Sequence, residues 1–363
     1  MRILFVSAAN SSHTVKWVNI LAQRGHQVVL ASQIDHRAEK DALDPLVRVE
    51  YLQYPGALGY YRNAAQLREL AAVTLPDVVN AHYATGYGTL ARRAQVKPLL
   101  LSIWGSDVYD FPQRSRFHRE LLEANLSYAQ AIASTSLIMA KEAEQYMKNG
   151  TPVFITPFGV DTSLFYPVPR AGQEEFVVGT AKRLEPESGV DMLLKAFRLF
   201  RTQVRINNPA GRLKLRIYGN GSEYAPLMGL ARDILISDDT EFFGQIANND
   251  VAKAFAGMDV VCLPSVRESF GVAAVEAMAC ARPVITSGAD GFLETVENDV
   301  TGIILPNPTE TLLADAMLKL YSDPLLRRAM GESGRRRAVV LYSLEECARG
   351  MEEALEYTAR LAD

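Results

Sequence analysis

Two glutamates lie eight positions apart where a short apolar run gives way to a helical pattern. Residues 260–263 read VVCL, which is typical of a buried strand, and Pro264 and Ser265 end that run. Glu268 follows in the loop, and Glu276 falls within the next stretch of small, helix-forming residues. The order strand, loop, helix therefore predicts two carboxylates around the start of one helix.

That helix start is itself suited to bind an anion. If the helix begins near Gly271, the backbone amides of Phe270, Gly271 and Val272 lack helical partners and favour a negative group such as a diphosphate. Eight residues of helix span about 12 Å, so Glu268 and Glu276 could meet hydroxyl groups at the two ends of an extended nucleotide sugar. The spacing alone leaves open that Glu276 belongs to a solvated helix face.

The same segment carries a family resemblance. It reads PSVRESFGVAAVEAMAC followed by RPVI, which resembles the signature of the family-four retaining glycosyltransferases of the GT-B fold. In that family the first Glu contacts the donor sugar, the second holds the ribose, and the amides after Phe-Gly contact sugar and phosphate. The resemblance assigns these roles to Glu268, Glu276 and residues 270–272. Ala281 stands where the family usually has Gly.

A second candidate site follows another predicted strand, in the segment GTAKRLEPESGV at 179–190. The family places an Arg and then a Lys here, and both cations grip the donor diphosphate. Arg183 matches the Arg, but Glu187 and Ser188 occupy the positions where the Lys is expected. Lys182 can replace it only if its side chain faces the site, and neighbouring residues of a strand point to opposite faces. The departure puts turnover in doubt more than fold.

Polar residues also follow strands in the first half of the chain. His82 and Asp107 come after two of them, and Trp104 stands where the family often has a His that meets donor and acceptor. We expect His82, Trp104 and Asp107 to line the acceptor site or its surroundings, although a lone His after a strand, such as His82, is more often structural. His13 lies in a first loop that either contacts the ligand or caps the next helix. In the second half, Gly219 could let the chain bend around the base.

Composition and charge narrow the class of protein. The chain has 363 residues, 48% of them hydrophobic, which suffices for two cores. A net charge of −4 argues against nucleic acid as the main partner. Residues 1–165 carry 16 basic and 14 acidic residues, net +2, and the remainder carries 22 and 28, net −6. The mildly positive first half leaves open an acidic acceptor or peripheral contact with an anionic membrane.

The cysteines and apolar runs bear on location. Cys262, Cys280 and Cys347 are odd in number and far apart, as expected of reduced thiols in a cytosolic protein. The first apolar run halts at Asn10 and reads as a strand, not as a signal peptide. No stretch approaches the ~20 apolar residues that cross a bilayer. We expect a cytoplasmic protein, and an association with the inner face of the membrane is left open.

Apolar β-branched runs alternate with helical stretches along both halves, which predicts an α/β fold with parallel sheets and ligands at the carboxyl ends of the strands. Residues 158–172 are rich in Gly, Pro and turn residues and are expected to form a linker. We expect an acceptor domain over 1–165, a nucleotide-sugar domain over 166–342 and, as in the GT-B fold, a final helix at 343–363 that returns to the first domain. The Arg-rich stretch 327–337 is expected to form a solvated helix surface.

The resemblance implies a GT-B protein with two Rossmann-like domains facing a central cleft. It implies retaining transfer of a hexose-type sugar from a nucleoside-diphosphate sugar to a hydroxyl of a glycan, a lipid-linked acceptor or a small molecule. It also implies no metal or other cofactor, because cationic side chains and helix amides carry the phosphate charge, and the sequence has no Asp-x-Asp pair to hold a metal. The sugar, the base, the acceptor and the oligomeric state are not determined.

Three other functions compete with this one. A non-catalytic sugar-nucleotide-binding protein of the same fold is favoured by the missing lysine. A GT-B epimerase would act on the donor alone. A nicotinamide dehydrogenase is disfavoured, because the first strand is not followed by the G-x-G-x-x-G turn.

Overall fold

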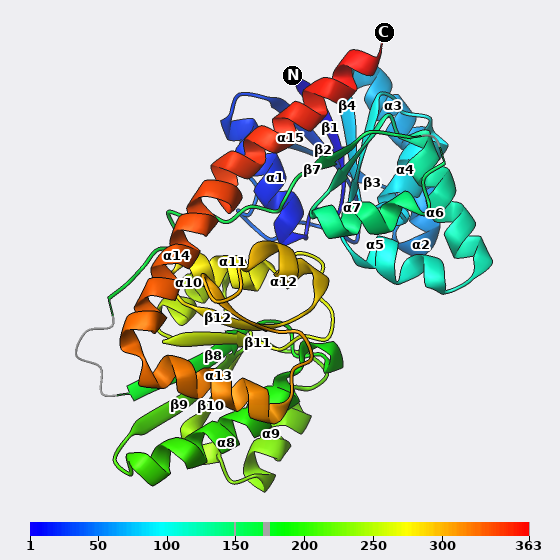
Figure 1. Ribbon diagram of the computed structural model, residues 1–363. Helices are drawn as coiled ribbons and strands as arrows, with labels where there is room; N and C mark the ends of the chain where they lie inside the picture. The colour runs from blue at the N-terminus through cyan, green and yellow to red at the C-terminus, as the bar shows by residue number, and fades with distance from the viewer. Residues whose placement is uncertain (149, 170–174, 363) are drawn as a thin grey trace. The chain divides into compact units, whose positions relative to one another are not determined.

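The computed structural model describes residues 1–148, 150–169 and 175–362, and the chain divides into two compact units (Figure 1). Unit 1 comprises Met1–Phe158 and the C-terminal segment from Glu345, and unit 2 comprises Gly159–Leu344. Unit 1 therefore ends before the boundary expected at residue 165. The end of the expected linker, at residues 170–172, lies outside the described residues.

Unit 1 is built on a parallel sheet with the strand order β3-β2-β1-β4-β5-β6-β7. The strands are β1 (Arg2–Val6), β2 (Gln27–Gln33), β3 (Arg48–Leu52), β4 (Val78–His82), β5 (Leu99–Ile103), β6 (Ala131–Ser134) and β7 (Val153–Ile155). The helices are α1 (Ser12–Gln23), α2 (Gly56–Arg62), α3 (Ala64–Thr74), α4 (Gly86–Ala94), α5 (Ser106–Tyr109), α6 (Arg116–Tyr128), α7 (Leu137–Glu144) and α15 (Leu344–Ala359).

Both faces of this sheet are buried. Side chains of successive residues in β1 point to opposite faces and belong to two different hydrophobic clusters. Ile3 and Phe5 join a cluster with α1 and α15, whereas Leu4 and Val6 join a cluster with α3 and α4. A strand covered on both faces reads as a continuous apolar run, which explains why β1 was recognisable from sequence.

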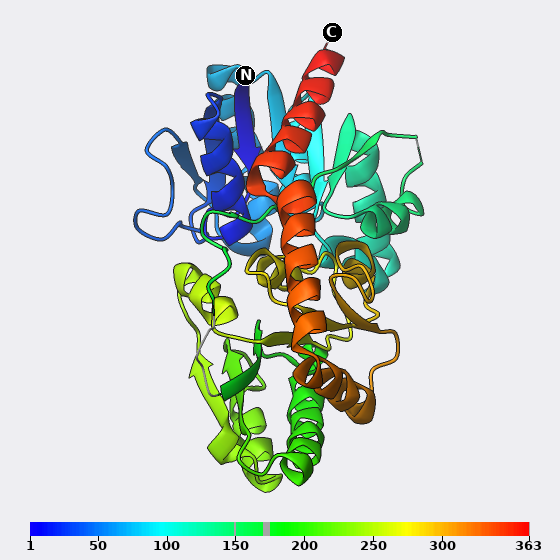
Figure 2. The same cartoon turned by 60° about the vertical axis from the view of Figure 1, so that its left-hand side comes forward.

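Helix α15 belongs to unit 1 although it lies at the far end of the chain. Its buried residues Cys347, Met351 and Leu355 share one hydrophobic cluster with Trp17 of α1. Figure 2 shows α15, in red, running across the face of the unit 1 sheet. The last helix thus completes the core of the first unit.

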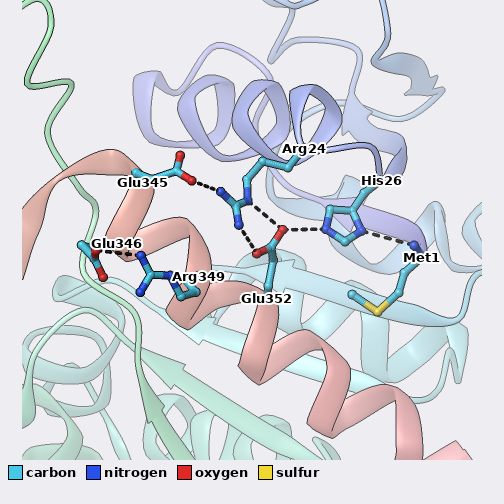
Figure 3. Close-up of polar contacts among 7 residues, drawn as sticks. All are labelled: Met1, Arg24, His26, Glu345, Glu346, Arg349 and Glu352. Carbon is cyan, nitrogen blue, oxygen red and sulfur yellow. Dashed lines mark hydrogen bonds and ion pairs between the residues drawn. The ribbon is translucent and has the colours of Figure 1, made fainter.

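Polar contacts hold α15 against the end of α1 (Figure 3). Arg24 donates from Nε to Glu352 Oε1 at 2.8 Å and from Nη2 to Glu352 Oε2 at 2.7 Å, and it also pairs with Glu345. His26 Nε2 lies 2.9 Å from Glu352 Oε1. The two hydrogen bonds from one guanidinium fix the direction as well as the distance of the Glu352 carboxylate.

Unit 2 has a second parallel sheet, in the order β10-β9-β8-β11-β12-β13. Its strands are β8 (Glu175–Ala181), β9 (Arg212–Tyr218), β10 (Thr240–Gly244), β11 (Val260–Leu263), β12 (Val284–Ser287) and β13 (Gly302–Leu305). Its helices are α8 (Val190–Asn207), α9 (Tyr224–Asp233), α10 (Asn248–Ala256), α11 (Val272–Ala279), α12 (Asp290–Thr295), α13 (Glu310–Ser322) and α14 (Pro324–Tyr342). Two Rossmann-like parallel sheets confirm the predicted fold class.

The Arg-rich stretch at 327–337 is not simply a solvated surface, so that expectation was wrong. Arg335 donates from Nη1 to the carbonyl oxygens of Phe165 and Ala279, at 2.6 and 2.7 Å. Arg337 donates to the carbonyl oxygens of Glu294 and Thr295, both at 2.9 Å. These arginines instead donate hydrogen bonds to backbone carbonyls of neighbouring segments. A buried carbonyl without such a partner would cost free energy.

Candidate functional site

The candidate site of unit 2 lies where the strand order reverses. β8 and β11 are neighbours in the sheet, but the chain continues from β8 to β9 on one side and from β11 to β12 on the other (Figure 1). Loops that leave such neighbours diverge and open a crevice at the carboxyl edge of the sheet. Residues 182–189 and 264–271 are these two loops, and they are the segments that the sequence singled out.

Direct contacts join the two loops. Val266 N donates to Glu187 O at 2.8 Å, and the ammonium of Lys182 donates to the Ser265 hydroxyl. A Cβ added to Gly189 would lie 2.2 Å from Pro264 O, so the backbones pack too closely for a side chain at that position. The two loops therefore form one surface.

Lys182 and Glu268 face each other across this surface. Lys182 Nζ lies 3.9 Å from Glu268 Oε2, and the two side chains are 14% and 25% exposed. Burial lowers the pKa of Lys182, while the negative charges of Glu268 and Glu187 act in the opposite direction. Charges in a site with so little water act more strongly on a ligand than charges on an open surface.

The Glu268 loop is braced from both ends. Glu268 Oε1 accepts a hydrogen bond from Gly271 N at 3.2 Å, and Glu268 O accepts one from Gly291 N at 2.8 Å. A Cβ on Gly291 would lie 2.4 Å from Phe270 N, so the start of α12 fits directly under the loop. The carboxylate is thereby held in place before any ligand binds.

Helix α11 begins at this loop, as predicted, with Val272 as its first residue. Gly271 precedes it with a φ of 89°, a left-handed conformation that glycine adopts without strain, and supplies no side chain to cap the helix. The side chain of Phe270 is buried and packs edge-to-face on Tyr342 at 5.5 Å between ring centroids, so this residue presents its backbone to the site. Glu276 lies within α11 and is partly exposed.

Lys182 and Arg183 both line one pocket of about 430 Å³, together with Glu185, Glu187, Ser188 and Arg267. The expectation that neighbouring residues could not share this face was wrong, because β8 ends at Ala181 and strand alternation no longer applies. The two cations differ in setting. Arg183 is 84% exposed and pairs with Glu185 at 3.1 Å, whereas Lys182 is largely buried.

Ser188, at one of the two positions where the lysine is expected, is buried, and its side chain bonds to the backbone of its own loop. Its hydroxyl donates to Arg183 O at 2.6 Å and accepts from Glu185 N at 3.3 Å. Ser188 and Glu185 thereby form a capping box for the short 3₁₀ turn at Pro186–Ser188. The hydroxyl is thus already engaged by the backbone.

Gly219 supports the Lys182 loop from the side of β9. It has a φ of 129°, and a Cβ on it would lie 1.9 Å from Lys182 O. Only glycine permits both this conformation and this approach. The structure therefore places Gly219 behind Lys182, where it positions the loop.

In unit 1, Asp107 is fully buried and its carboxylate accepts hydrogen bonds from the backbone. The donors are Ala84 N at 2.9 Å, Gly105 N at 2.8 Å and Trp104 N at 3.1 Å. Burial raises the pKa of Asp107, and these hydrogen bonds act against that rise. The geometry favours a role in shaping the Trp104 loop over direct contact with a sugar.

His82, Trp104 and His13 form one aromatic cluster, which also includes Phe158. The ring centroids of His82 and Trp104 lie 5.1 Å apart, and His13 stacks on Phe158 at 3.7 Å and meets Trp104 edge-on at 5.6 Å. Burial lowers the pKa of both histidines to about 3, so each is neutral near pH 7. His82 Nε2 lies 2.5 Å from Asn80 Oδ1, inside the protein.

Within unit 2 the structure thus brings together Lys182 and Glu268, with Arg183 on the same pocket and Gly219 behind it. Sequence reasoning missed Ser265 and Arg267 as parts of this site and treated Glu187 only as a position of the absent lysine. The parallel register pairs Val178 with Val260 and Gly179 with Val261, and its continuation sets residue 264 beside Lys182. If the sequence had revealed that β8 and β11 are neighbours, this register would have indicated that Ser265 lies near Lys182.

The described residues contain neither a metal-binding cluster nor a membrane-spanning helix. No group of three or more His, Cys, Asp or Glu side chains among them is arranged to hold a metal ion. Among the same residues, no helix combines the length and apolarity that crossing a membrane requires.

Known protein families match most of the chain. Residues 2–136 match the family model described as "Glycosyl transferase 4-like", and residues 166–337 match "Glycosyl transferases group 1". The first match lies in unit 1 and the second in unit 2.

Individual proteins are similar over long segments. A D-inositol 3-phosphate glycosyltransferase of Kribbella flavida is 28% identical over 284 residues, which cover 71% of this chain and 66% of the relative. The match therefore spans just under two thirds of that protein.

Solved structures share the fold. A sucrose-phosphate synthase from Thermosynechococcus elongatus matches with a TM-score of 0.83 at 22% identity, covering 100% of both chains. HepE from Anabaena, solved in complex with UDP, matches with a TM-score of 0.80 at 18% identity, covering 98% of this chain and 100% of the other.

Proposed function

Because the chain belongs to the group 1 glycosyltransferases of the GT-B fold, we propose that it transfers a hexose-type sugar from a nucleoside-diphosphate sugar to an acceptor hydroxyl, with retention of the anomeric configuration. The observation that carries this proposal is the pair of Lys182 and Glu268, 3.9 Å apart, beside the pocket that Lys182 and Arg183 line. A cation and a carboxylate that face each other suit a ligand with both phosphates and hydroxyl groups.

Four side chains of unit 2 and the amide end of α11 contact different parts of the donor. Lys182 and Arg183 hold the diphosphate together with the amide end of α11. Glu268, fixed by the amide of Gly271, accepts hydrogen bonds from hydroxyl groups of the transferred sugar. Glu276 on α11 holds the ribose. HepE, which has the same fold, binds UDP, and this supports a nucleotide at the site.

Charge on the leaving diphosphate is carried by side chains and amides, so the reaction proceeds without a metal ion. Fixed positive groups aimed at a developing negative charge stabilise the transition state by a few kcal/mol each. The leaving phosphate accepts the proton of the attacking hydroxyl on the same face of the sugar. This requires no protein base, which agrees with two histidines, His13 and His82, that burial keeps from protonation.

The acceptor is bound by unit 1, beside the aromatic cluster of His13 and Trp104. Aromatic faces of this kind pack against the apolar faces of sugar rings. The acceptor is a glycan, a lipid-linked molecule or a small polyol, and inositol 3-phosphate is the first to try, because a similar protein carries that name. Cys262, Cys280 and Cys347 are buried thiols, which supports a cytoplasmic location. Peripheral contact with the inner face of the membrane would be needed only for a lipid-linked acceptor.

The test is a transfer assay with nucleotide sugars against inositol 3-phosphate and a set of glycans. The anomeric proton coupling of the product, followed by NMR, reports the stereochemistry. We expect a product with the configuration of the donor, formed at the same rate in EDTA. An inverted product, or loss of the reaction in EDTA that Mg²⁺ restores, would refute the mechanism.

One observation favours a second function. Glu187 and Ser188 stand where the lysine is expected, and Ser188 belongs to a capping box, as in a binding protein that has lost turnover. Product analysis separates the possibilities, because a non-catalytic protein binds the donor and leaves it intact. An epimerase alters the donor without any acceptor, so the assay includes a sample that contains donor alone.

A further inference from the structure

We propose that Lys182 is the principal cation for the donor diphosphate in this protein and takes the place of the lysine that is absent from positions 187 and 188. The inference rests on the proposed function, since it names the residue of that same site that binds the phosphates. Three observations carry it: the position of the ammonium, the engagement of Ser188 and the exposure of Arg183.

The Lys182 ammonium is directed into the site by its neighbours. It donates to the Ser265 hydroxyl from the β11 loop and faces Glu268 Oε2 at 3.9 Å. An ammonium has three donors, and a carboxylate at 3.9 Å is too distant for a hydrogen bond. The geometry therefore leaves donor capacity on the pocket side, where an anion can take it.

Ser188 cannot perform this role. Its side chain is buried at 3% exposure, and its hydroxyl is used by Arg183 O and Glu185 N in the loop turn. A cation at position 188 would have to abandon that cap and enter a closely packed position. The positive charge instead lies six residues earlier, on Lys182, directly after the end of β8.

Arg183 is the weaker candidate for the main contact. Its side chain is 84% exposed and pairs with Glu185, which is itself hydrogen-bonded by Ser222 at 2.6 Å. Exposed pairs contribute little because water screens them. Lys182, at 14% exposure, interacts with an anion through far less water.

The experiment compares the wild-type protein with Lys182→Met, which keeps the length of the side chain and removes its charge. Calorimetry measures the dissociation constants of UDP, GDP and ADP and of their nucleosides. We expect the preferred diphosphate to bind about ten to a hundred times more weakly to the variant, with the matching nucleoside changed by less than about twofold. Lys182→Arg should recover most of the loss.

A control is Lys319→Ala. Lys319 is an exposed lysine on α13 of unit 2, and it pairs with Asp299 at 3.1 Å. Its diphosphate affinity should equal that of the wild type. Equal diphosphate affinity in Lys182→Met and wild type would overturn the assignment of Lys182 and leave the proposed function intact. An equal loss for diphosphate and nucleoside would also overturn it, since the lysine would then be holding the pocket together. If no diphosphate binds the wild type, both proposals fail.

Discussion

Lys182 Nζ lies 3.9 Å from Glu268 Oε2, although the two residues come from different loops. The cation follows β8 and the carboxylate follows β11, at the reversal of strand order. The two side chains can bind different parts of one donor: the cation binds its phosphates, and the carboxylate accepts hydrogen bonds from its sugar hydroxyls. Substitutions of each group should therefore affect different parts of the ligand.

Glu268→Gln tests the sugar contact. The amide keeps the size of the side chain but loses the charge that accepts strong hydrogen bonds, so the extra affinity of the nucleotide sugar over the free diphosphate should fall by about 1.5–3 kcal/mol. Free diphosphate should bind as well as before or slightly better, because a negative charge beside Lys182 has gone. Calorimetry with both ligands measures the difference, and equal losses for both would contradict the role.

Glu276→Ala tests the ribose contact. If Glu276 accepts hydrogen bonds from ribose hydroxyls, the nucleoside and its diphosphate should both bind roughly ten- to a hundredfold more weakly. The matching 2′,3′-dideoxynucleotide, which lacks these hydroxyls, should bind wild type and variant alike. Unchanged binding of the ordinary nucleotide would mean that this face of α11 is simply solvated.

Glu187→Lys should strengthen diphosphate binding by about fivefold, because it exchanges an exposed negative charge on the pocket for a positive one. Ser188→Lys should instead lower the thermal midpoint, because it removes the hydroxyl that caps the loop turn. Binding curves and thermal melts of the two variants measure these effects. A gain in affinity for Ser188→Lys without loss of stability would show that the loop accepts the family arrangement.

The elements around the candidate site could be predicted because their signals are local. β8 and β11 are apolar runs ended by polar or turn residues, and α11 begins where small residues follow Gly271. The contact between Lys182 and Ser265 could not be predicted, because it depends on which strands are neighbours in the sheet. Strand alternation gave the wrong answer for Lys182 because the strand ends one residue earlier.

Long-range packing explains the other differences. From sequence, Asp107 was expected to contact a ligand. Its local sequence does not show that three backbone amides donate hydrogen bonds to its carboxylate. Arg335 and Arg337 looked solvated because their carbonyl partners lie 42 or more residues away in the chain. A charged residue is exposed by default, and only the fold reveals the partners that bury it.

Acid should destabilise unit 1 through its two buried histidines. Their pKa values, lowered by burial to about 3, lie below the unfolded value of 6.5, so the unfolded chain binds more protons between these limits. The stability that these two histidines contribute is therefore fully present above about pH 6.5 and is lost as the pH drops toward 3. His13→Phe, which preserves stacking on Phe158, should show a smaller loss between pH 7 and pH 5.

Urea unfolding followed by tryptophan fluorescence measures this effect. The chain has two tryptophans, Trp17 and Trp104, and both lie in unit 1, so the signal reports that unit. If the wild type and His13→Phe lose the same stability between pH 7 and pH 5, His13 does not contribute to the acid sensitivity.

Glu352→Gln should destabilise unit 1 by about 1–2 kcal/mol, because it weakens a largely buried, two-point contact with Arg24. Hydrogen bonds from Arg24 hold the pKa of Glu352 below its usual value, so its contribution is present at neutral pH and lost as the pH falls through the lowered pKa. The thermal midpoint of unit 1 measures the change. Glu356→Gln, which removes an exposed contact with Arg360, is the control and should shift the midpoint little.

Calorimetric titration of the wild-type protein with UDP-, GDP- and ADP-sugars, repeated with Glu276→Ala and Lys182→Met, tests the proposed donor site directly. We expect one nucleotide sugar to bind in preference to the others and both variants to lose affinity for it, because they remove its ribose and phosphate contacts. No binding of any nucleotide sugar to the wild type, or binding that neither variant weakens, would contradict the placement of the donor at the carboxyl edge of β8 and β11.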